Sequence, residues 1–266
     1  MLYKYELKGE VRVNTLRNKL LNNEKIRGTL VCLTDPCLCE IIGNIGYDCV
    51  WIDMEHTYVT YKDVLCHLNA AKSSGISSVV RLPQNDLTAT KKILEMSPDG
   101  IIFPMVKSAN ELKELIETTL YPPYGTRGFG PMRAIEYGAA DVNEYVKSKS
   151  LELCRFVQIE DVGLIDDIEE ILDYPYVDGF VFGPNDLSGS MKMFMDKYND
   201  KMFSVMKNTT EKLKKAGKFV GLAGGISEEE IKFWAPLNLD MLFMGADWNF
   251  IYECGKKNLD LLNKYI

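Results

Sequence analysis

The chain alternates short apolar runs with stretches in which apolar residues recur at helical spacing. Eight runs are rich in Val, Ile, Leu and Phe and are mostly unbroken by charge, as expected for strands that are buried on both faces. These predicted strands are Gly28–Leu33, Tyr47–Asp53, Ile76–Leu82, Gly100–Met105, Cys154–Ile159, Gly179–Phe182, Phe219–Ala223 and Met241–Gly245.

Helix-starting residues stand between these strands. Side chains suited to capping a helix, or a proline suited to its first turn, occur at Asp35 or Pro36, Thr60, Asp86, Ser108, near Asp161 and at Ser227. Regular strand–helix alternation predicts a parallel sheet, and eight repeats predict a (β/α)8 TIM barrel. The alternative is a doubly wound open sheet, which would normally carry a Gly-rich fingerprint after the first strand. The chain has Leu33-Thr34-Asp35-Pro36 there, which favours the barrel.

Two segments exceed a minimal barrel. Tyr121–Gly138 is a long loop with Pro, Gly, Arg and aromatic residues, a composition typical of an ordered functional loop. The tail from Asn249 to Ile266 has helical spacing, and it either closes the barrel or packs on a neighbouring subunit. We expect one barrel domain over 1–266, with its core at about 14–250 and a C-terminal helix at 251–266.

Composition narrows the class of protein. The 266 residues are 46% apolar and 26% charged, which argues against disorder, and no apolar run is long enough to span a membrane. A net charge of −7 argues against a nucleic-acid binder. The seven cysteines fall mostly in apolar runs, as reduced thiols used for packing do. Because Met1 to Asn14 also lacks the apolar stretch of a secretory signal, we expect a cytoplasmic protein.

Polar side chains gather where the predicted strands end. In a barrel these carboxyl-terminal ends form the active site. The residues found there are Asp53, Glu55 and His56 after the second strand, Arg81 in the third, Gln158 and Glu160 in the fifth, and Asn185 and Asp186 after the sixth. Their convergence at one end predicts a catalytic site.

Glu160 and Asp186 are candidate ligands of a divalent cation. Two carboxylates with waters suit Mg²⁺ or Mn²⁺, and Co²⁺ is a further candidate. The alternative is that each carboxylate only caps a helix. Arg81 lies in an apolar run, where a buried guanidinium needs an anion, and a carboxylate substrate or enolate would supply one. His56 is as well explained by a loop-holding role as by catalysis, whereas His67 lies within a predicted helix and is expected to be structural.

A Gly-rich turn follows the seventh predicted strand. Gly224 and Gly225, within Gly221–Ser227, resemble the phosphate-binding turn of many barrels, in which backbone N–H groups hold an anion. The alternative is a tight turn without a ligand.

Taken together, these motifs resemble the HpcH/HpaI family of class II, metal-dependent pyruvate aldolases. The family includes 4-hydroxy-2-oxoheptanedioate and 2-keto-3-deoxy sugar-acid aldolases. The matching stretches, in order from about residue 14 to 250, are 46–56 (GYDCVWIDMEH), 80–86 (VRLPQND), 103–110 (FPMVKSAN), 121–128 (YPPYGTRG), 157–160 (VQIE), 177–188 (VDGFVFGPNDLS) and 221–223 (GLA).

The resemblance implies a role for each matched site residue. Glu160 and Asp186 would bind the divalent metal, and Gln158 and the backbone around Asn185 would hold pyruvate. Arg81 would contact the keto oxygen and stabilise the enolate.

His56 would be the general base. The family places a carboxylate from an adjacent subunit beside this histidine, and the matching position holds Glu95, where many members have Asp. The resemblance therefore implies a homo-oligomer, a trimer or a hexamer, and the C-terminal helix is a candidate for exchange between subunits.

The implied reaction is reversible retro-aldol cleavage of a 4-hydroxy-2-oxo acid to pyruvate and an aldehyde. Both reactants are small molecules, and no nucleic acid or membrane is involved. Two alternatives stay open. One is a related acyl-CoA or phosphosugar lyase that uses Gly224 and Gly225, and the other is a non-catalytic pyruvate-binding barrel.

The long loop also has a candidate role. Arg127 and Arg133 could bind the far end of an acidic substrate, while Tyr124 and Phe129 pack on its carbon skeleton. An equally weighted alternative is that Arg127 only braces the loop.

Overall fold

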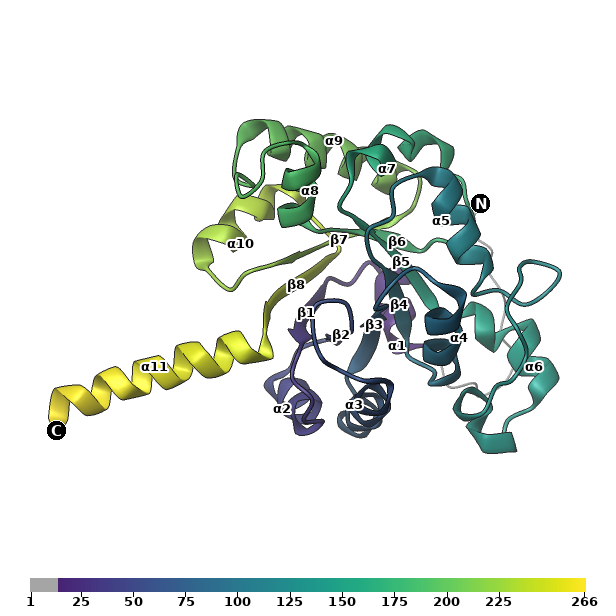
Figure 1. Cartoon of the computed structure of the whole chain (residues 1–266), viewed down its shortest axis with the longest axis horizontal. Helices are drawn as coiled ribbons and strands as arrows, with labels where there is room; N and C mark the ends of the chain where they lie inside the picture. Colours follow the sequence, from purple (N-terminus) through teal and green to yellow (C-terminus); the bar gives the residue numbers. More distant parts are fainter. Residues whose placement is uncertain (1–13) are drawn as a thin grey trace.

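The computed structural model describes residues 14–266. Residues 1–13, where the sequence predicts no secretory signal, lie outside the described residues. Eight parallel strands pair in chain order and close into a barrel (Figure 1). The strands are β1 (Ile26–Val31), β2 (Cys49–Asp53), β3 (Ser77–Arg81), β4 (Gly100–Phe103), β5 (Cys154–Ile159), β6 (Gly179–Phe182), β7 (Phe219–Gly224) and β8 (Met241–Ala246). The predicted TIM barrel is confirmed.

Helices surround the barrel, and most of them cover its outer side. They are α1 (Thr15–Leu21), α2 (Cys37–Ile45), α3 (Tyr61–Ser74), α4 (Leu87–Glu95), α5 (Ala109–Glu117), η1 (Arg133–Gly138), α6 (Val142–Lys147), η2 (Lys149–Leu151), α7 (Val162–Asp166), η3 (Ile168–Glu170), α8 (Pro184–Ser190), α9 (Asp200–Lys215), α10 (Glu228–Trp234), η4 (Ala235–Leu237) and α11 (Asp247–Tyr265). Five predicted caps are confirmed, because the side chains of Thr60, Asp86, Ser108, Asp161 and Ser227 each accept a backbone N–H in the first turn. At the sixth predicted start, Pro36 precedes α2 without a side-chain cap, and Asp35 accepts the N–H of Cys37.

Burial explains why these apolar runs are strands. Alternate residues of a strand face opposite ways, so Trp51 packs inside the barrel and Val50 packs against the helices. Leu16 and Leu20 of α1 join the inner cluster and close the amino-terminal end of the barrel. The other end is left for polar residues.

An aspartate stands directly before every second strand. Asp48, Asp99, Asp178 and Asp240 each accept the backbone N–H of a residue on the preceding strand, at 2.8 to 3.0 Å. Each of these aspartates also donates its own N–H to the carbonyl of that same residue. This fourfold pattern joins neighbouring strands at the amino-terminal rim, where a structural role is expected.

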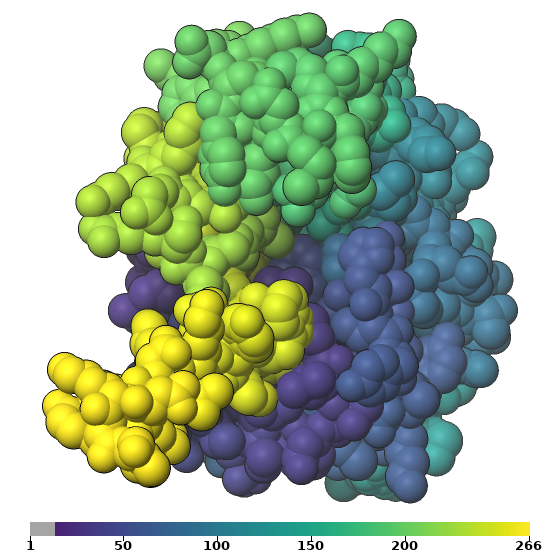
Figure 2. Space-filling view, turned by 60° about the vertical axis from the view of Figure 1, so that its left-hand side comes forward, coloured from purple at the N-terminus to yellow at the C-terminus, as the bar shows by residue number. Residues whose placement is uncertain are grey.

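The last helix leaves the barrel. α11 begins at Asp247, two residues before the predicted start, because the buried Asp247 carboxylate accepts the backbone N–H groups of Cys32 and Leu33 beyond β1. Beyond that turn the helix extends away from the body of the molecule (Figures 1 and 2), and Ile251 and Leu259 are exposed. Among residues 14–266, no helix has the length and apolar character needed to cross a membrane.

Candidate active site

Polar residues form the last inward-facing layer at the carboxyl-terminal end of the barrel. Trp51 and Val79 are buried inside and lie opposite each other on β2 and β3. Two residues further along, Asp53 and Arg81 are likewise paired, so their side chains also point into the barrel. The Arg81 guanidinium carbon lies 5.3 Å from the centre of the Trp51 ring. The predicted convergence of polar strand ends is therefore present in the structure.

Arg81 is held by protein carboxylates. Its Nε and Nη2 donate to the two oxygens of Asp53 at 2.8 and 2.6 Å. Its Nη1 lies 2.9 Å from Glu55 Oε2 and 3.3 Å from Gln158 Oε1. Burial lowers the pKa of Arg81, but the ion pairs with Asp53 and Glu55 outweigh it and leave the pKa raised. The sequence suggested a substrate anion as the partner, whereas the chain itself neutralises this guanidinium.

Glu160 continues the same network. Gln158 Nε2 donates to Glu160 Oε1 at 2.7 Å, and the backbone N–H of Met105 donates to Oε2 at 2.9 Å. Burial, together with the nearby negative charges of Glu55 and Asp186, raises the pKa of Glu160 to about 7, although the Met105 N–H and Arg81 act in the opposite direction. Glu160 is therefore a carboxylate that a nearby positive charge would stabilise.

A glycine leaves room beside the Glu160 carboxylate. A Cβ atom at Gly183 would lie 2.5 Å from Glu160 Oε1, so no other residue fits here without displacing that side chain. The next turn, at the start of α8, carries Asn185 and Asp186, which are both exposed. Among residues 14–266, no three His, Cys, Asp or Glu side chains group as a metal site by themselves. Any cation held here would thus need ligands from water or substrate.

His56 lies at the edge of this site. Its side chain is 63% exposed, and its Nε2 is 3.6 Å from Glu55 Oε2. His67, by contrast, is buried, with Nε2 3.0 Å from the carbonyl oxygen of Leu33 and Nδ1 3.8 Å from Cys39 Sγ. The expectation that His67 is structural is confirmed.

Sequence reasoning placed Asp53 and Glu55 at this end of the barrel but did not foresee that they bind Arg81, and it missed the contributions of Gly183 and Met105. A signal was present for Asp53 and Glu55, because two acids spaced by two residues at a strand end share the face that carries Arg81 on the next strand. No comparable signal marked Met105, which acts through its backbone.

The Gly-rich turn after β7 lies against a carboxylate of the same chain, that of Glu230. Cβ atoms at Gly224 and Gly225 would lie 3.0 and 2.6 Å from the carboxylate of Glu230, which also pairs with Lys197 at 2.9 Å. Burial raises the pKa of Glu230, but hydrogen bonds from Lys197, Tyr198 and the Gly225 N–H outweigh it and lower the pKa. The suggested phosphate site is therefore filled by Glu230, which removes the support for a phosphosugar lyase.

Glu95 lies at the other end of the barrel. It ends α4, next to the start of β4, whereas His56 follows the end of β2. Arg127 Nη2 donates to Glu95 Oε1 at 3.1 Å, and its guanidinium stacks 4.5 Å from the Tyr121 ring centre. Arg127 is buried, so of the two roles weighed for it the structure shows the bracing one.

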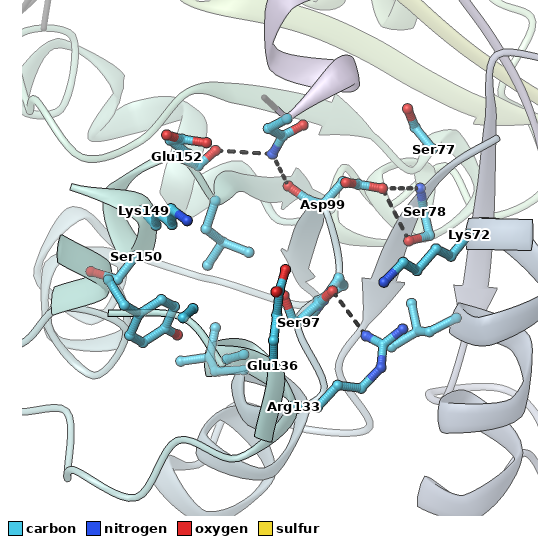
Figure 3. A pocket seen from close by; sticks show the side chains of 18 of the residues that line it. Lys72, Ser77, Ser78, Ser97, Asp99, Arg133, Glu136, Lys149, Ser150 and Glu152 are labelled. Atoms are coloured by element: carbon cyan, nitrogen blue, oxygen red, sulfur yellow. Dashed lines mark hydrogen bonds between the residues drawn. The ribbon is translucent and has the colours of Figure 1, made fainter. Parts of the chain in front are cut away.

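The long loop borders a cavity at this amino-terminal end. The cavity measures about 640 Å³ and is lined by residues that begin or precede strands, among them Ser78 and Asp99 (Figure 3). Arg133 reaches into it and donates to Asn69 Oδ1 at 3.0 Å. Within one chain, Arg127 and Arg133 lie away from the strand ends that carry Arg81, because the loop joins α5 to β5 and so lies at the opposite end of the barrel.

Known proteins share this sequence pattern and fold. The family model for HpcH/HpaI aldolase/citrate lyase matches residues 28–229. A hydroxypyruvate/pyruvate aldolase of Roseovarius nubinhibens is 27% identical over 246 residues, 92% of this chain and 95% of that protein. A 2-keto-3-deoxy-L-rhamnonate aldolase of Escherichia coli is 29% identical over 78% of each chain.

Solved structures agree with these relatives. The crystal structure of the HpcH/HpaI aldolase from Desulfitobacterium hafniense superimposes with a TM-score of 0.85 at 25% identity, covering 93% of this chain and 96% of that one. The match spans the barrel strands that carry Arg81 and Glu160, and the resemblance inferred from the sequence is confirmed. The chain belongs to the HpcH/HpaI aldolase/citrate lyase family and is an enzyme of the retro-aldol lyase type.

Proposed function

We propose that the enzyme is a divalent-metal-dependent pyruvate aldolase that cleaves a 4-hydroxy-2-oxo acid to pyruvate and an aldehyde, reversibly. The observation that carries this proposal is the buried chain of hydrogen bonds from Arg81 through Gln158 to Glu160 at the carboxyl-terminal end of the barrel. The relatives named as hydroxypyruvate/pyruvate and 2-keto-3-deoxy-L-rhamnonate aldolases support the same substrate class.

The residues fit a divalent cation. Glu160 and Asp186 would hold it, since both offer carboxylate oxygens and hard cations such as Mg²⁺, Mn²⁺ or Co²⁺ take oxygen ligands. Burial and the negative charges of Glu55 and Asp186 raise the pKa of Glu160 despite the nearby Arg81, so a further positive charge beside this carboxylate would be favourable. Gly183 keeps the space beside Glu160 open. When bound, the cation would supply a Lewis acid for the negative charge that develops at the keto oxygen of the substrate.

Arg81, Gln158 and Asn185 would bind the pyruvate half of the substrate. The double contact with Asp53 fixes the plane of the Arg81 guanidinium before substrate arrives, so little reorganisation is needed as charge develops. Gln158 is oriented between Arg81 and Glu160, and Asn185 is exposed in the turn that follows Gly183.

His56 would act as the general base. It would take the proton from the C4 hydroxyl while the C3–C4 bond breaks, so that the aldehyde leaves and the electron pair moves towards the C2 keto oxygen. Protonation at C3 then gives pyruvate. Its exposed position at the site edge suits a group that meets the aldehyde half. Glu95 of an adjacent subunit would support His56, since Glu95 of the same chain lies at the opposite end of the barrel.

This role of Glu95 requires a homo-oligomer, which we propose to be a trimer or a hexamer. The exposed apolar side chains of α11 support an exchanged C-terminal helix that packs on a neighbour, beyond a barrel core ending near residue 250. All seven cysteines are free thiols, which supports a reducing compartment, and we place the enzyme in the cytoplasm.

Pyruvate release from a panel of 4-hydroxy-2-oxo acids tests the proposed function directly. We expect turnover without coenzyme A or phosphate, loss of turnover on treatment with EDTA, and recovery on addition of Mg²⁺, Mn²⁺ or Co²⁺. Turnover that persists after complete removal of metal would contradict the metal-dependent mechanism. Absence of any turnover with the whole panel would contradict the proposed substrate class.

A further inference from the structure

One peptide group joins the loop after β3 to Glu160. The peptide between Pro104 and Met105 follows β4, and its N–H, on Met105, donates to Glu160 Oε2 at 2.9 Å. Its carbonyl oxygen, on Pro104, accepts from Asn85 Nδ2 at 2.6 Å. The C=O and N–H of a trans peptide point in opposite directions, so both ends of this one group are held.

The backbone at Met105 is unusual. Its φ is +51°, in the left-handed region that a residue with a side chain rarely adopts. Rotating the Pro104–Met105 peptide by half a turn would bring φ of Met105 to an ordinary negative value. The same rotation would turn the Pro104 carbonyl oxygen towards the Glu160 carboxylate. That arrangement is unfavourable, because both groups are hydrogen-bond acceptors and neither can donate to the other. The observed conformation therefore requires an interaction that opposes rotation of the Pro104–Met105 peptide.

Asn85 provides that opposition. Only the amide nitrogen of its side chain can donate to a carbonyl, so the contact with Pro104 also defines its orientation. The residue is held in turn by its neighbour Asp86, whose side chain caps α4 by accepting the N–H of Ala89 at 2.6 Å. The loop after β3 is therefore a firm anchor for the peptide.

We propose that Asn85 is a positioning residue for the metal site, acting through the Pro104–Met105 peptide to hold the Glu160 carboxylate in its binding orientation. The inference rests on the proposed function, in which Glu160 is a metal ligand. Partners that orient a ligating carboxylate typically change metal affinity on the order of 10- to 100-fold when they are removed.

The first test is binding of Mn²⁺ alone, followed by the electron paramagnetic resonance signal of the free ion. We expect Asn85→Ala to raise the Mn²⁺ dissociation constant on the order of tenfold. Gln84→Ala is the matched control, because this neighbouring amide donates to Asp86 and not to Pro104. An Asn85→Ala protein that binds Mn²⁺ as the wild type does would overturn the proposal.

The second test separates positioning from a general structural role. Glycine adopts a positive φ without strain, so Met105→Gly should weaken the tendency to flip and partly restore Mn²⁺ binding in the Asn85→Ala background. The Met105 side chain is 39% exposed, so its loss leaves no large internal cavity. Failure of this rescue would overturn the proposal, because the effect of Asn85 would then not pass through the peptide.

A third variant decides the question if Asn85→Ala does not fold. Met105→Val, with Asn85 intact, should weaken Mn²⁺ binding because a β-branched residue resists the left-handed region. Unchanged binding by this variant would overturn the proposal.

Glu160→Gln distinguishes a failure of the metal-ligand assignment from a failure of the role given to Asn85. If the wild-type protein does not bind Mn²⁺, or if Glu160→Gln binds it equally well, the assignment of Glu160 as a metal ligand is contradicted. The positioning role of Asn85 is then contradicted as well.

Discussion

Glu160 lies where several charged side chains meet out of reach of bulk water. It is 2% exposed, and Glu55 and Asp186 add negative charge to its surroundings while Arg81 adds positive charge. A carboxyl group in this position is easily protonated unless a cation stabilises its charged form. Its behaviour with pH therefore reports on the site.

Metal affinity should fall as the pH drops below about 7, the pKa to which burial raises Glu160 in the metal-free protein. Protons then compete for the ligand, so we expect the Mn²⁺ dissociation constant to rise by about tenfold per pH unit well below that pKa. Titration calorimetry between pH 5 and 8.5 measures this. A dissociation constant independent of pH over that range would contradict the assignment.

The same shift has a consequence for stability. Because the pKa of Glu160 is raised in the folded state, the folded metal-free protein binds more protons than the unfolded chain. The resulting contribution to the free energy of unfolding is complete below the ordinary Glu pKa of 4.5, and it is lost as the pH rises to about 7. Urea denaturation should show a smaller decline for Glu160→Gln than for wild type.

Gly183 offers a test in which no charged group is changed. Gly183→Ala places a Cβ 2.5 Å from Glu160 Oε1, so the carboxylate must move. We expect at least tenfold weaker Mn²⁺ binding, by analogy with other changes beside metal ligands, with the fold retained. Gly189→Ala, in the helix α8 that Gly183 directly precedes, is the control, since its nearest neighbour is the exposed Phe194 ring at 3.3 Å. Equal metal binding by the two variants would remove Gly183 from the site.

The base role of His56 can be separated from metal binding. His56→Asn should slow aldol cleavage by about 10²- to 10⁴-fold, the usual contribution of a general base. Decarboxylation of oxaloacetate takes no proton from a C4 hydroxyl and should be much less affected. Steady-state kinetics of both reactions decide the matter, and equal losses would exclude the base role.

At the scale of elements, the loop from Tyr121 to Gly138 is a structural connection that depends on Arg127. Its guanidinium is buried, stacks on Tyr121, and donates to Glu95 and to the Tyr145 hydroxyl at 3.0 Å. One side chain thus ties α4, the loop and α6 together at the amino-terminal end of the barrel. Buried donors and acceptors left without partners are costly.

Arg127→Met should therefore lower the free energy of unfolding by about 2 kcal/mol, because Glu95 and Tyr145 lose a buried partner. Lys232→Met is the control, since its ion pair with Glu228 is largely exposed and should contribute little. Urea denaturation measures both. Any loss of activity should be the same for acidic and neutral substrates, and a selective loss for acidic ones would restore a role in substrate recognition.

At the scale of the whole molecule, one chain does not bring together every group that the proposed mechanism uses. His56 and Glu95 lie at opposite ends of the barrel. α11 extends away from the body of the molecule (Figure 1), and apolar side chains such as Ile251 and Leu259 are exposed on it. A second chain would resolve both features, since it can bring its own Glu95 to His56 and cover the helix.

Complementation between inactive variants tests this arrangement. His56→Asn and Glu95→Gln proteins should each have reduced activity, whereas oligomers formed from both should regain part of it. A mixed pair has an intact His56 on one chain beside an intact Glu95 on the other. Activity is assayed after the two proteins are co-expressed, with sedimentation confirming the oligomer. No gain over the separate variants would contradict a site shared between chains.

The sequence alone determined the barrel, its helix caps and its family. Strands such as Gly179–Phe182 are uniformly apolar because both faces are buried, and caps such as Thr60 act on their own first turn. Both signals are local, so they can be read without the fold. The order of the strand ends also indicated that Arg81, Gln158 and Glu160 would come together.

Only the tertiary structure decided which partners these groups have. The Arg81 guanidinium is neutralised by Asp53, and the Glu230 carboxylate lies in the turn at Gly225. Within the chain, Arg127 donates to Glu95 rather than facing a substrate. Each of these interactions joins residues on different elements, and the end of the barrel on which a loop lies depends on whether it leads out of a strand or into one. Such contacts depend on closure of the barrel and on side-chain packing, which a pattern along the chain does not specify.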